Sequence, residues 1–253
     1  SGFLARLSGQ LTGVPSIAFT KDLPLSFQGA GKDIPNISLK ADPKAHFNAR
    51  QAAVLSNMYK GTPLAAATAD GLALPTTISD DLRNEMIKAS RGAPSARNFA
   101  AETQRIATLM RDQYRLGFVD VGGWDTHVNQ GSVTGGLANN LRNLGEGLAA
   151  YADALGDEWN NTTVVVLSEF GRTFRENGDK GTDHGHGSVY WVLGGQVRGG
   201  RLAGEQVAVT RASLNQDRDW PVLTDYRALF GGLFQRLYGL NQTQLQTVFP
   251  GAT

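Results

Sequence analysis

The stretch "GTDHGHGS" at residues 181–188 holds Asp183, His184 and His186, and its two histidines are half of the four in the 253-residue chain. Glycines flank and separate them, so the segment is a loop that cannot shelter imidazoles in a core. Imidazoles and carboxylates without thiols are ligands that suit Zn²⁺, Mn²⁺, Fe²⁺ and similar divalent cations. These residue types therefore predict a metal site. The alternative is a solvated loop whose histidines bind nothing.

Two further polar clusters follow apolar segments. Asp125 and His127 lie in "GGWDTH", directly after "GFVDV", and Ser168, Glu169 and Arg172 lie in "SEFGR", after "VVVL". Because ligands of open parallel sheets bind beyond the carboxyl ends of the strands, we expect these clusters and the histidine loop to meet at one sheet edge. The guanidinium fork of Arg172 matches a phosphate or sulfate group.

Each cluster also has a purely structural interpretation. Asp125 can close an Asx-turn, with His127 bonded to backbone, and Glu169 with Arg172 can form a salt bridge. Ser168 is expected to be a hydrogen-bonding residue rather than a nucleophile, because no G-x-S-x-G motif surrounds it. The three clusters together favour the metal site. Its candidate ligands are Asp125, His127, Glu169, Asp183, His184 and His186.

The elements that must position these residues are predicted to form a strand–helix–strand unit. Residues 117–121 and 162–167 are short and apolar, as in buried strands. A helix over about 134–156 is predicted from one apolar stripe, made of Leu137, Leu141, Leu144, Leu148, Tyr151 and Leu155. In such a unit the strands are parallel and the crossover is right-handed. Residues 168–187 form a polar loop longer than ordinary connections, which suggests a functional loop.

Other signals complete a predicted layered α/β fold. Thr224 is the predicted N-cap of a final amphipathic helix. Predicted helices cover 42–59, 80–90 and 96–115, and predicted strands cover 17–19, 189–193 and 206–210. No linker divides the chain, so residues 1–253 are expected to form a single domain, with loops and helices mainly over 1–116 and a βαβ core with the metal-site motifs over 117–240.

Composition excludes several classes of protein. The net charge is +1 and no run of like charges occurs, so no nucleic-acid partner is expected. Cysteine is absent, which excludes disulfides, thiolate ligands and a cysteine nucleophile. No segment approaches the ~18 apolar residues of a membrane span. The chain opens "SGFLARL", without an initiator Met or signal peptide, and we expect it to derive from a longer chain.

Three stretches carry a family resemblance: "GGWDTHVNQ", "VVVLSEFGRTFRENGDKGTDHGHGSVYWVLGG" and "LTDYRALFGGLFQRLYGL". They resemble an uncharacterised bacterial family, a domain of unknown function, within the alkaline phosphatase and sulfatase-like superfamily. The likeness covers nearly all of the chain and is densest over residues 117–240. It implies a layered, mostly parallel sheet with helices on both faces, twin-arginine export and a periplasmic or secreted location. It also implies a metal centre, whose ligands by motif are Asp125, His127, Glu169, Asp183, His184 and His186.

The chain departs from the family pattern in two places. Glu169 stands where better-known superfamily members have an Asp-His pair. The superfamily's first strand, which supplies a metal-binding acid and has the Ser or Thr nucleophile nearby, has no match here. We therefore expect the chain to be the C-terminal two-thirds of a precursor, whose N-terminal segment can persist as a separate partner chain.

These observations predict a metal-dependent hydrolase of phosphate or sulfate esters, with this chain alone incomplete for catalysis. Zn²⁺ or Mn²⁺ is favoured as cofactor over Ca²⁺, Mg²⁺ or Fe²⁺, and Arg172 would hold the anionic group of a small ester substrate. The alternative is a secreted, non-catalytic metal-binding or structural protein with a degenerate site. Association into a homo-oligomer is a further expectation.

Overall fold

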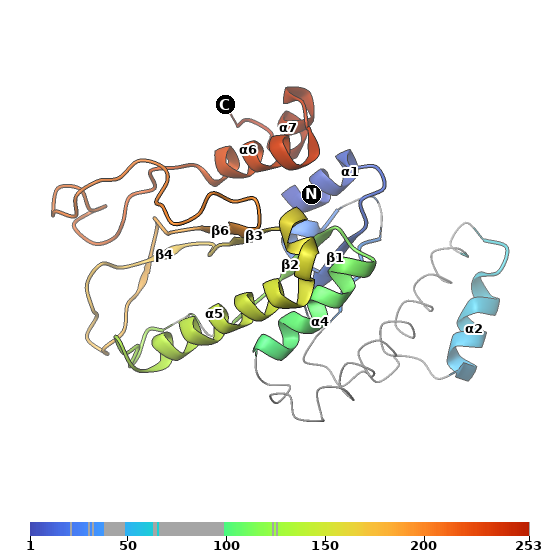
Figure 1. Ribbon diagram of the computed structural model, residues 1–253, viewed down its shortest axis with the longest axis horizontal. Helices are drawn as coiled ribbons and strands as arrows, with labels where there is room; N and C mark the ends of the chain where they lie inside the picture. The colour runs from blue at the N-terminus through green and yellow to red at the C-terminus, as the bar shows by residue number, and fades with distance from the viewer. Residues whose placement is uncertain are drawn as a thin grey trace. The chain divides into compact units, whose positions relative to one another are not determined.

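A computed structural model describes residues 1–20, 22–29, 31, 33–37, 49–62, 65, 99–122, 124 and 126–252 (Figure 1). The chain divides into two compact units, Ser1–Asp120 and Val121–Thr253, and each is described by itself. The predicted helix over 80–90 and the candidate ligand Asp125 lie outside the described residues.

The first unit is built around a parallel pair of strands, β1 (Ser16–Phe19) and β2 (Leu116–Val119), which lie side by side in Figure 1. Every residue of β1 is buried, which confirms the short strand predicted there. The part of this unit that the structure describes also contains α1 (Phe3–Gln10), η1 (Leu25–Phe27), α2 (Ala49–Tyr59) and α4 (Phe99–Asp112). Its core includes Leu7, Ile17, Phe27 and Leu109, all fully buried.

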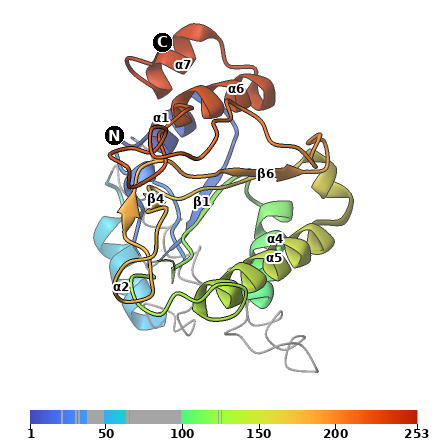
Figure 2. The same cartoon turned by 90° about the vertical axis from the view of Figure 1, so that its left-hand side faces the viewer.

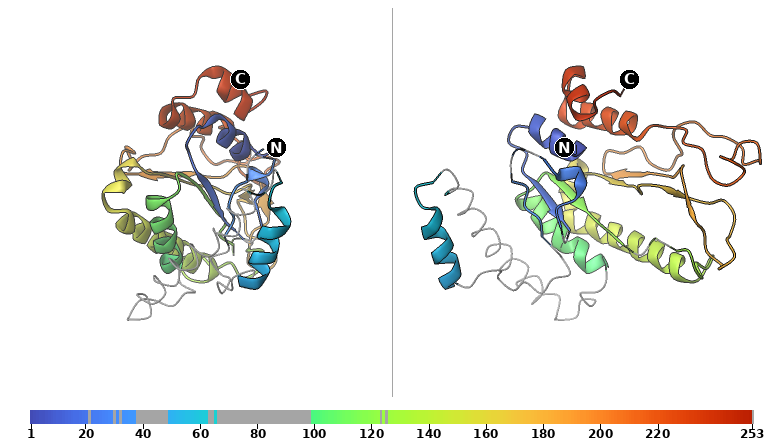
Figure 3. Two further views of the ribbon diagram at one scale, coloured as in Figure 1. Left: turned by 90° about the vertical axis from the view of Figure 1, so that its right-hand side faces the viewer. Right: turned by 180° about the vertical axis from the view of Figure 1, so that it is seen from behind.

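The second unit contains the long predicted helix, α5 (Gly136–Leu155), visible as the yellow-green helix in Figure 3. Within the apolar stripe Leu144, Tyr151 and Leu155 are buried, whereas Leu141 is exposed. A short η2 (Gly156–Asn161) follows, and its Trp159 ring packs edge-on against Tyr151, with 6.4 Å between ring centroids. The helix therefore forms where predicted.

The strand pairing within the second unit differs from the mostly parallel sheet that was predicted. β3 (Thr163–Val166) pairs antiparallel with β6 (Trp191–Gly194), and in the first unit β2 pairs with β1. The segment between β3 and β6 explains their antiparallel pairing. It contains β4 (Gly171–Arg172) and β5 (His184–Gly185), which pair antiparallel with each other and so reverse the direction of the chain. The described protein is a mixed α/β structure with two-stranded sheets.

The C-terminal part corrects two further predictions and adds a helix. Residues 206–210 form no strand and are exposed throughout, so their β-branched side chains have no apolar face to cover. Asp225, not Thr224, caps α6 (Tyr226–Tyr238), because its carboxylate accepts from the Arg227 backbone N–H at 2.8 Å. An unpredicted α7 (Gln242–Val248) begins with a capping box and lies near α6 in Figure 2.

Apolar helices of membrane-spanning length are not found in the part of the chain that the structure describes.

Candidate functional site

The structure brings together three of the predicted site residues: His127, Asp183 and His184. The ring nitrogen Nδ1 of His127 lies 2.9 Å from Oδ1 of Asp183, and its Nε2 lies 3.1 Å from Nε2 of His184. The side chains of His127 and Asp183 are both partly open to solvent. Residues from two motifs more than fifty positions apart thus meet at one place in the second unit.

Backbone pairing between two loops causes this meeting. The N–H groups of Asn129 and Gln130 donate to the carbonyls of Asp179 and Lys180 at 3.0 and 2.8 Å, and Thr182 N–H donates to Thr126 O at 3.2 Å. The loops approach so closely at Gly181 that an added Cβ would lie 2.2 Å from the His127 carbonyl carbon and oxygen. Glycine is therefore required at this crossing, and it explains one glycine of the histidine loop.

Asn177 organises the same crossing and was not identified from the sequence. Its side-chain Nδ2 donates to both His127 O and Asp183 Oδ1 at 3.0 Å, while its Oδ1 accepts from the backbone N–H groups of Asp179 and Gly181. The bond from Asn177, with that from His127, lowers the pKa of Asp183 despite opposition from burial. An Asn in the turn-rich stretch "ENGDKG" is a signal only for a turn.

His184 is held from two further sides. Its ring stacks on Phe170, with 4.0 Å between centroids and 29° between the planes. Its backbone carbonyl accepts from Arg218 NH2 at 2.8 Å. Neither contact was anticipated, because Phe170 was a spacer in "SEFGR" and Arg218 lay outside the recognised motifs.

The two candidates in "SEFGR" have different surroundings. Arg172 Nε donates to Thr182 Oγ1 at 3.0 Å, and Thr182 Oγ1 donates in turn to Gln130 Oε1 at 2.7 Å, so Arg172 braces the paired loops. Glu169 accepts a long bond of 3.4 Å from the hydroxyl of Ser168. The structure does not bring Glu169 to the histidine pair, and an anion-binding role for Arg172 stays a prediction.

The last predicted ligand, His186, faces a different carboxylate. Its Nδ1 lies 2.8 Å from Oδ2 of Asp219, and its backbone N–H donates to the same oxygen at 2.8 Å. Asp219 is 2% exposed. Asp219 was not predicted from the sequence, because the stretch "NQDRDW" is typical of a polar turn. No local pattern indicates that one of its two acidic residues is buried.

These donors partly fit a divalent metal ion. About 3.3 Å separates two nitrogens bound at about 2.0–2.1 Å in a tetrahedral zinc site, close to the distance between the Nε2 atoms of His127 and His184. A carboxylate on Nδ1 is the partner that metal-binding histidines usually have. Within the described residues, however, no group of three His, Asp or Glu side chains converges closely enough to hold a metal. A third ligand would have to come from outside this group of residues.

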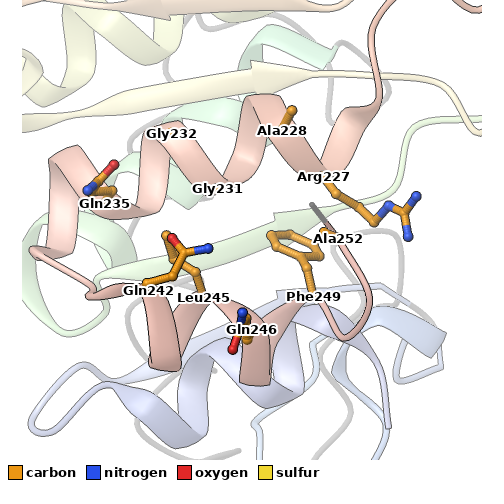
Figure 4. Close-up of a pocket in the computed structure, with 10 residues that line it drawn as sticks. All are labelled: Arg227, Ala228, Gly231, Gly232, Gln235, Gln242, Leu245, Gln246, Phe249 and Ala252. Atoms are coloured by element: carbon orange, nitrogen blue, oxygen red, sulfur yellow. The ribbon is translucent and has the colours of Figure 1, made fainter.

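A separate hollow lies between α6 and α7 (Figure 4). Ala228, Gly231 and Gly232 leave the α6 wall flat, and Leu245 and Phe249 line the opposite side. None of the predicted site residues lines this hollow, so it does not belong to the histidine cluster.

Residues 1–249 match a protein family described as "Protein of unknown function (DUF1501)". The chain belongs to the DUF1501 family. The match spans both compact units and all three motifs, and it confirms the predicted membership of a domain-of-unknown-function family. Comparisons with curated proteins and with solved structures gave no match.

Proposed function

We propose that this DUF1501 protein is a metal-dependent hydrolase of phosphate or sulfate esters, with His127 and His184 as ligands of a divalent cation such as Zn²⁺ or Mn²⁺. The observation that carries the proposal is the approach of the two Nε2 atoms to 3.1 Å, with Asp183 on the other nitrogen of His127. Asp125, by its place in the motif, is the proposed third ligand.

The hydrogen bonds support a ligand role for His127. The lowered pKa of Asp183 keeps its carboxylate ionised, and an ionised carboxylate only accepts hydrogen bonds. Nδ1 of His127 must therefore carry the proton, which leaves a lone pair on Nε2 when the ring is neutral. That lone pair points at His184. A shared proton or a cation satisfies two facing nitrogens, and the partly exposed position lets a cation enter.

Nearby positive charge supports an anionic substrate. Arg218 bonds to the backbone of His184, and Arg172 braces the loop that carries Asp183. A bound divalent cation would polarise the ester oxygen. The two arginines would offset the negative charge of a phosphate or sulfate beside it.

The family resemblance supports a finer classification. We propose an alkaline-phosphatase-like fold of the whole family domain, twin-arginine export and a periplasmic or secreted location, with a small anionic ester as ligand and homo-oligomers as the assembled form. The mixed α/β structure and the parallel pair β1–β2 are compatible with such a fold.

Metal binding and turnover in matched variants test the proposal. The protein is loaded with Zn²⁺ or Mn²⁺ and assayed on aryl phosphate, aryl phosphodiester and aryl sulfate, with bound metal measured after dialysis. His127→Ala and His184→Ala should each lose metal and turnover. His46→Ala, which changes the one histidine outside the motifs, should keep both.

Two results would contradict the proposal. Turnover that persists unchanged in His127→Ala and His184→Ala would exclude these residues from the reaction. Stoichiometric metal that raises the melting temperature, without turnover of any ester, would favour the non-catalytic metal-binding alternative.

A further inference from the structure

Arg105 of α4 is a buried cation without a partner among the described residues. Only 7% of its surface is exposed. No hydrogen bond or ion pair joins its guanidinium to any residue that the structure describes. Burial of a charge is costly unless the charge is paired and hydrogen-bonded, so an anionic partner at this position would be strongly stabilised.

The two other arginines in and directly after α4 are both bonded. Arg111 Nε donates to Asp112 Oδ1 at 2.8 Å, and Arg115 Nη1 donates to the Met110 carbonyl at 3.0 Å. Both of these arginines are exposed. The least exposed arginine of the three is therefore the one without a bond to a described residue.

Solvent still reaches the charged tip of Arg105. Within the described part of the chain, Ser26 Oγ is the one side-chain polar atom that is enclosed from solvent and also lacks a hydrogen bond. The nitrogens of Arg105 lack bonds but are not enclosed, so part of its remaining surface lies on the guanidinium. The aliphatic stem is therefore buried and held in place, while the tip stays accessible to an ion.

The fold places Arg105 near the carboxyl end of β2. Met110 packs on this strand, because a Cβ added at Gly117 would lie 2.8 Å from its Sδ. Residues 113–115 connect α4 to β2, and this short connection reverses the chain, so the first half of α4 lies toward the end of the strand. The helix spans about 7.5 Å from Met110 back to Arg105. The strand spans about 6.6 Å from Gly117 to its end at Val119, so Arg105 is level with that end.

This edge of a parallel strand pair is a place where ligands bind. In open α/β sheets they bind beyond the carboxyl ends of the strands, and β1 and β2 are parallel. Asp120 directly follows β2, but it is exposed and shares no ion pair with Arg105, although the structure describes both residues. The cation at this edge is therefore not neutralised by the acid closest to it along the strand.

We infer that Arg105 binds an oxyanion, the phosphate, sulfate or carboxylate group of a small ligand, at the carboxyl edge of β1 and β2. A planar guanidinium donates two parallel hydrogen bonds to such a group. Arg105 belongs to the first unit, whereas the histidine cluster belongs to the second. The inference is therefore independent of metal binding and of ester hydrolysis.

Anion titration of matched variants tests the inference. The melting temperature of the intact protein is measured in a zwitterionic buffer with rising sodium phosphate, sulfate or acetate, at an ionic strength held constant with chloride. With at least one of these anions, wild type should show a saturable rise of roughly 5 °C or more at about 100 times the Kd. Arg105→Met keeps an apolar stem without the charge, so the affinity for that anion should fall by about 10–100-fold. Arg111→Met is the matched control, because it removes an exposed arginine of the same helix and should keep the full response.

NMR of the arginine side chains reads the same site without the methionine variant. In protein labelled with ¹⁵N, the Nε–H signal of Arg105 is assigned by its loss in Arg105→Lys, and it should shift in wild type as the stabilising anion is added. This measurement keeps the test decisive if Arg105→Met does not fold. A carboxylate of this chain in place of a ligand would leave the signal unmoved by all three anions, and that result would overturn the inference. An equal anion response in Arg105→Met and Arg111→Met would overturn it as well.

Discussion

Replacement of Gly181 by alanine puts a methyl group where the backbone of the neighbouring loop already lies. The new Cβ would be 2.2 Å from the carbonyl carbon and oxygen of His127 and 2.5 Å from Thr126 O. Carbon atoms in contact prefer about 3.5–4.0 Å, so the two loops must separate by more than about 1 Å. Since the backbone of Gly181 has no left-handed φ, the effect is one of space alone.

The separation breaks the backbone pairing that positions the histidines. The bonds at risk join Asn129 to Asp179, Gln130 to Lys180 and Thr182 to Thr126. Each backbone hydrogen bond contributes about 1 kcal/mol net, so losing all of them costs about 3 kcal/mol. For a unit of this size, that corresponds to a fall in melting temperature of roughly 6–12 °C.

Thermal unfolding, followed by circular dichroism, measures this cost against a matched variant in the same loop. Gly178→Ala adds the same methyl group where no atom lies within 4 Å, and it should change stability by less than about 0.5 kcal/mol. Zinc affinity should fall in Gly181→Ala alone, because His127 moves away from His184. Equal melting temperatures for the two alanine variants would refute the steric argument.

Three further substitutions test other parts of the structure. Burial raises the pKa of Tyr151 to about 12 from 10.0. The free energy of unfolding should therefore be unaffected by this group below pH 10 and should fall as the pH rises from 10 towards 12. In urea unfolding, Tyr151→Phe should show a smaller fall over this pH range. The bond from Arg227 lowers the pKa of Asp225, whose stabilising effect is present above pH 3.8 and lost as the pH falls through the lowered value. Arg227→Met should raise that pKa, as read from the Asp225 carboxyl shift in ¹³C NMR; an unchanged pKa would contradict the assignment. Gln216→Gly relieves a left-handed φ and should raise the free energy of unfolding by on the order of 1 kcal/mol; a loss of stability in denaturant titrations would contradict it.

Local patterns in the sequence determined much of the secondary structure and the chemistry of the candidate site. The apolar stripe of α5 and the β-branched run of β3 specify those elements because helix and strand periods depend on neighbouring residues alone. His127 and His184 were candidates because the chain has few histidines and these lie among glycines and acidic residues. The structure places their Nε2 atoms 3.1 Å apart.

Only the tertiary structure decided which segments pair and which carboxylate each histidine meets. β3 pairs antiparallel with β6 because the hairpin of β4 and β5 turns the chain back, and no periodicity within β3 encodes that partner. Asp219 is buried beside His186 because a strained turn carries it across to Gly185. Burial and pairing of this kind depend on residues far apart in the chain, so the sequence supplied the chemical groups and the fold selected their partners.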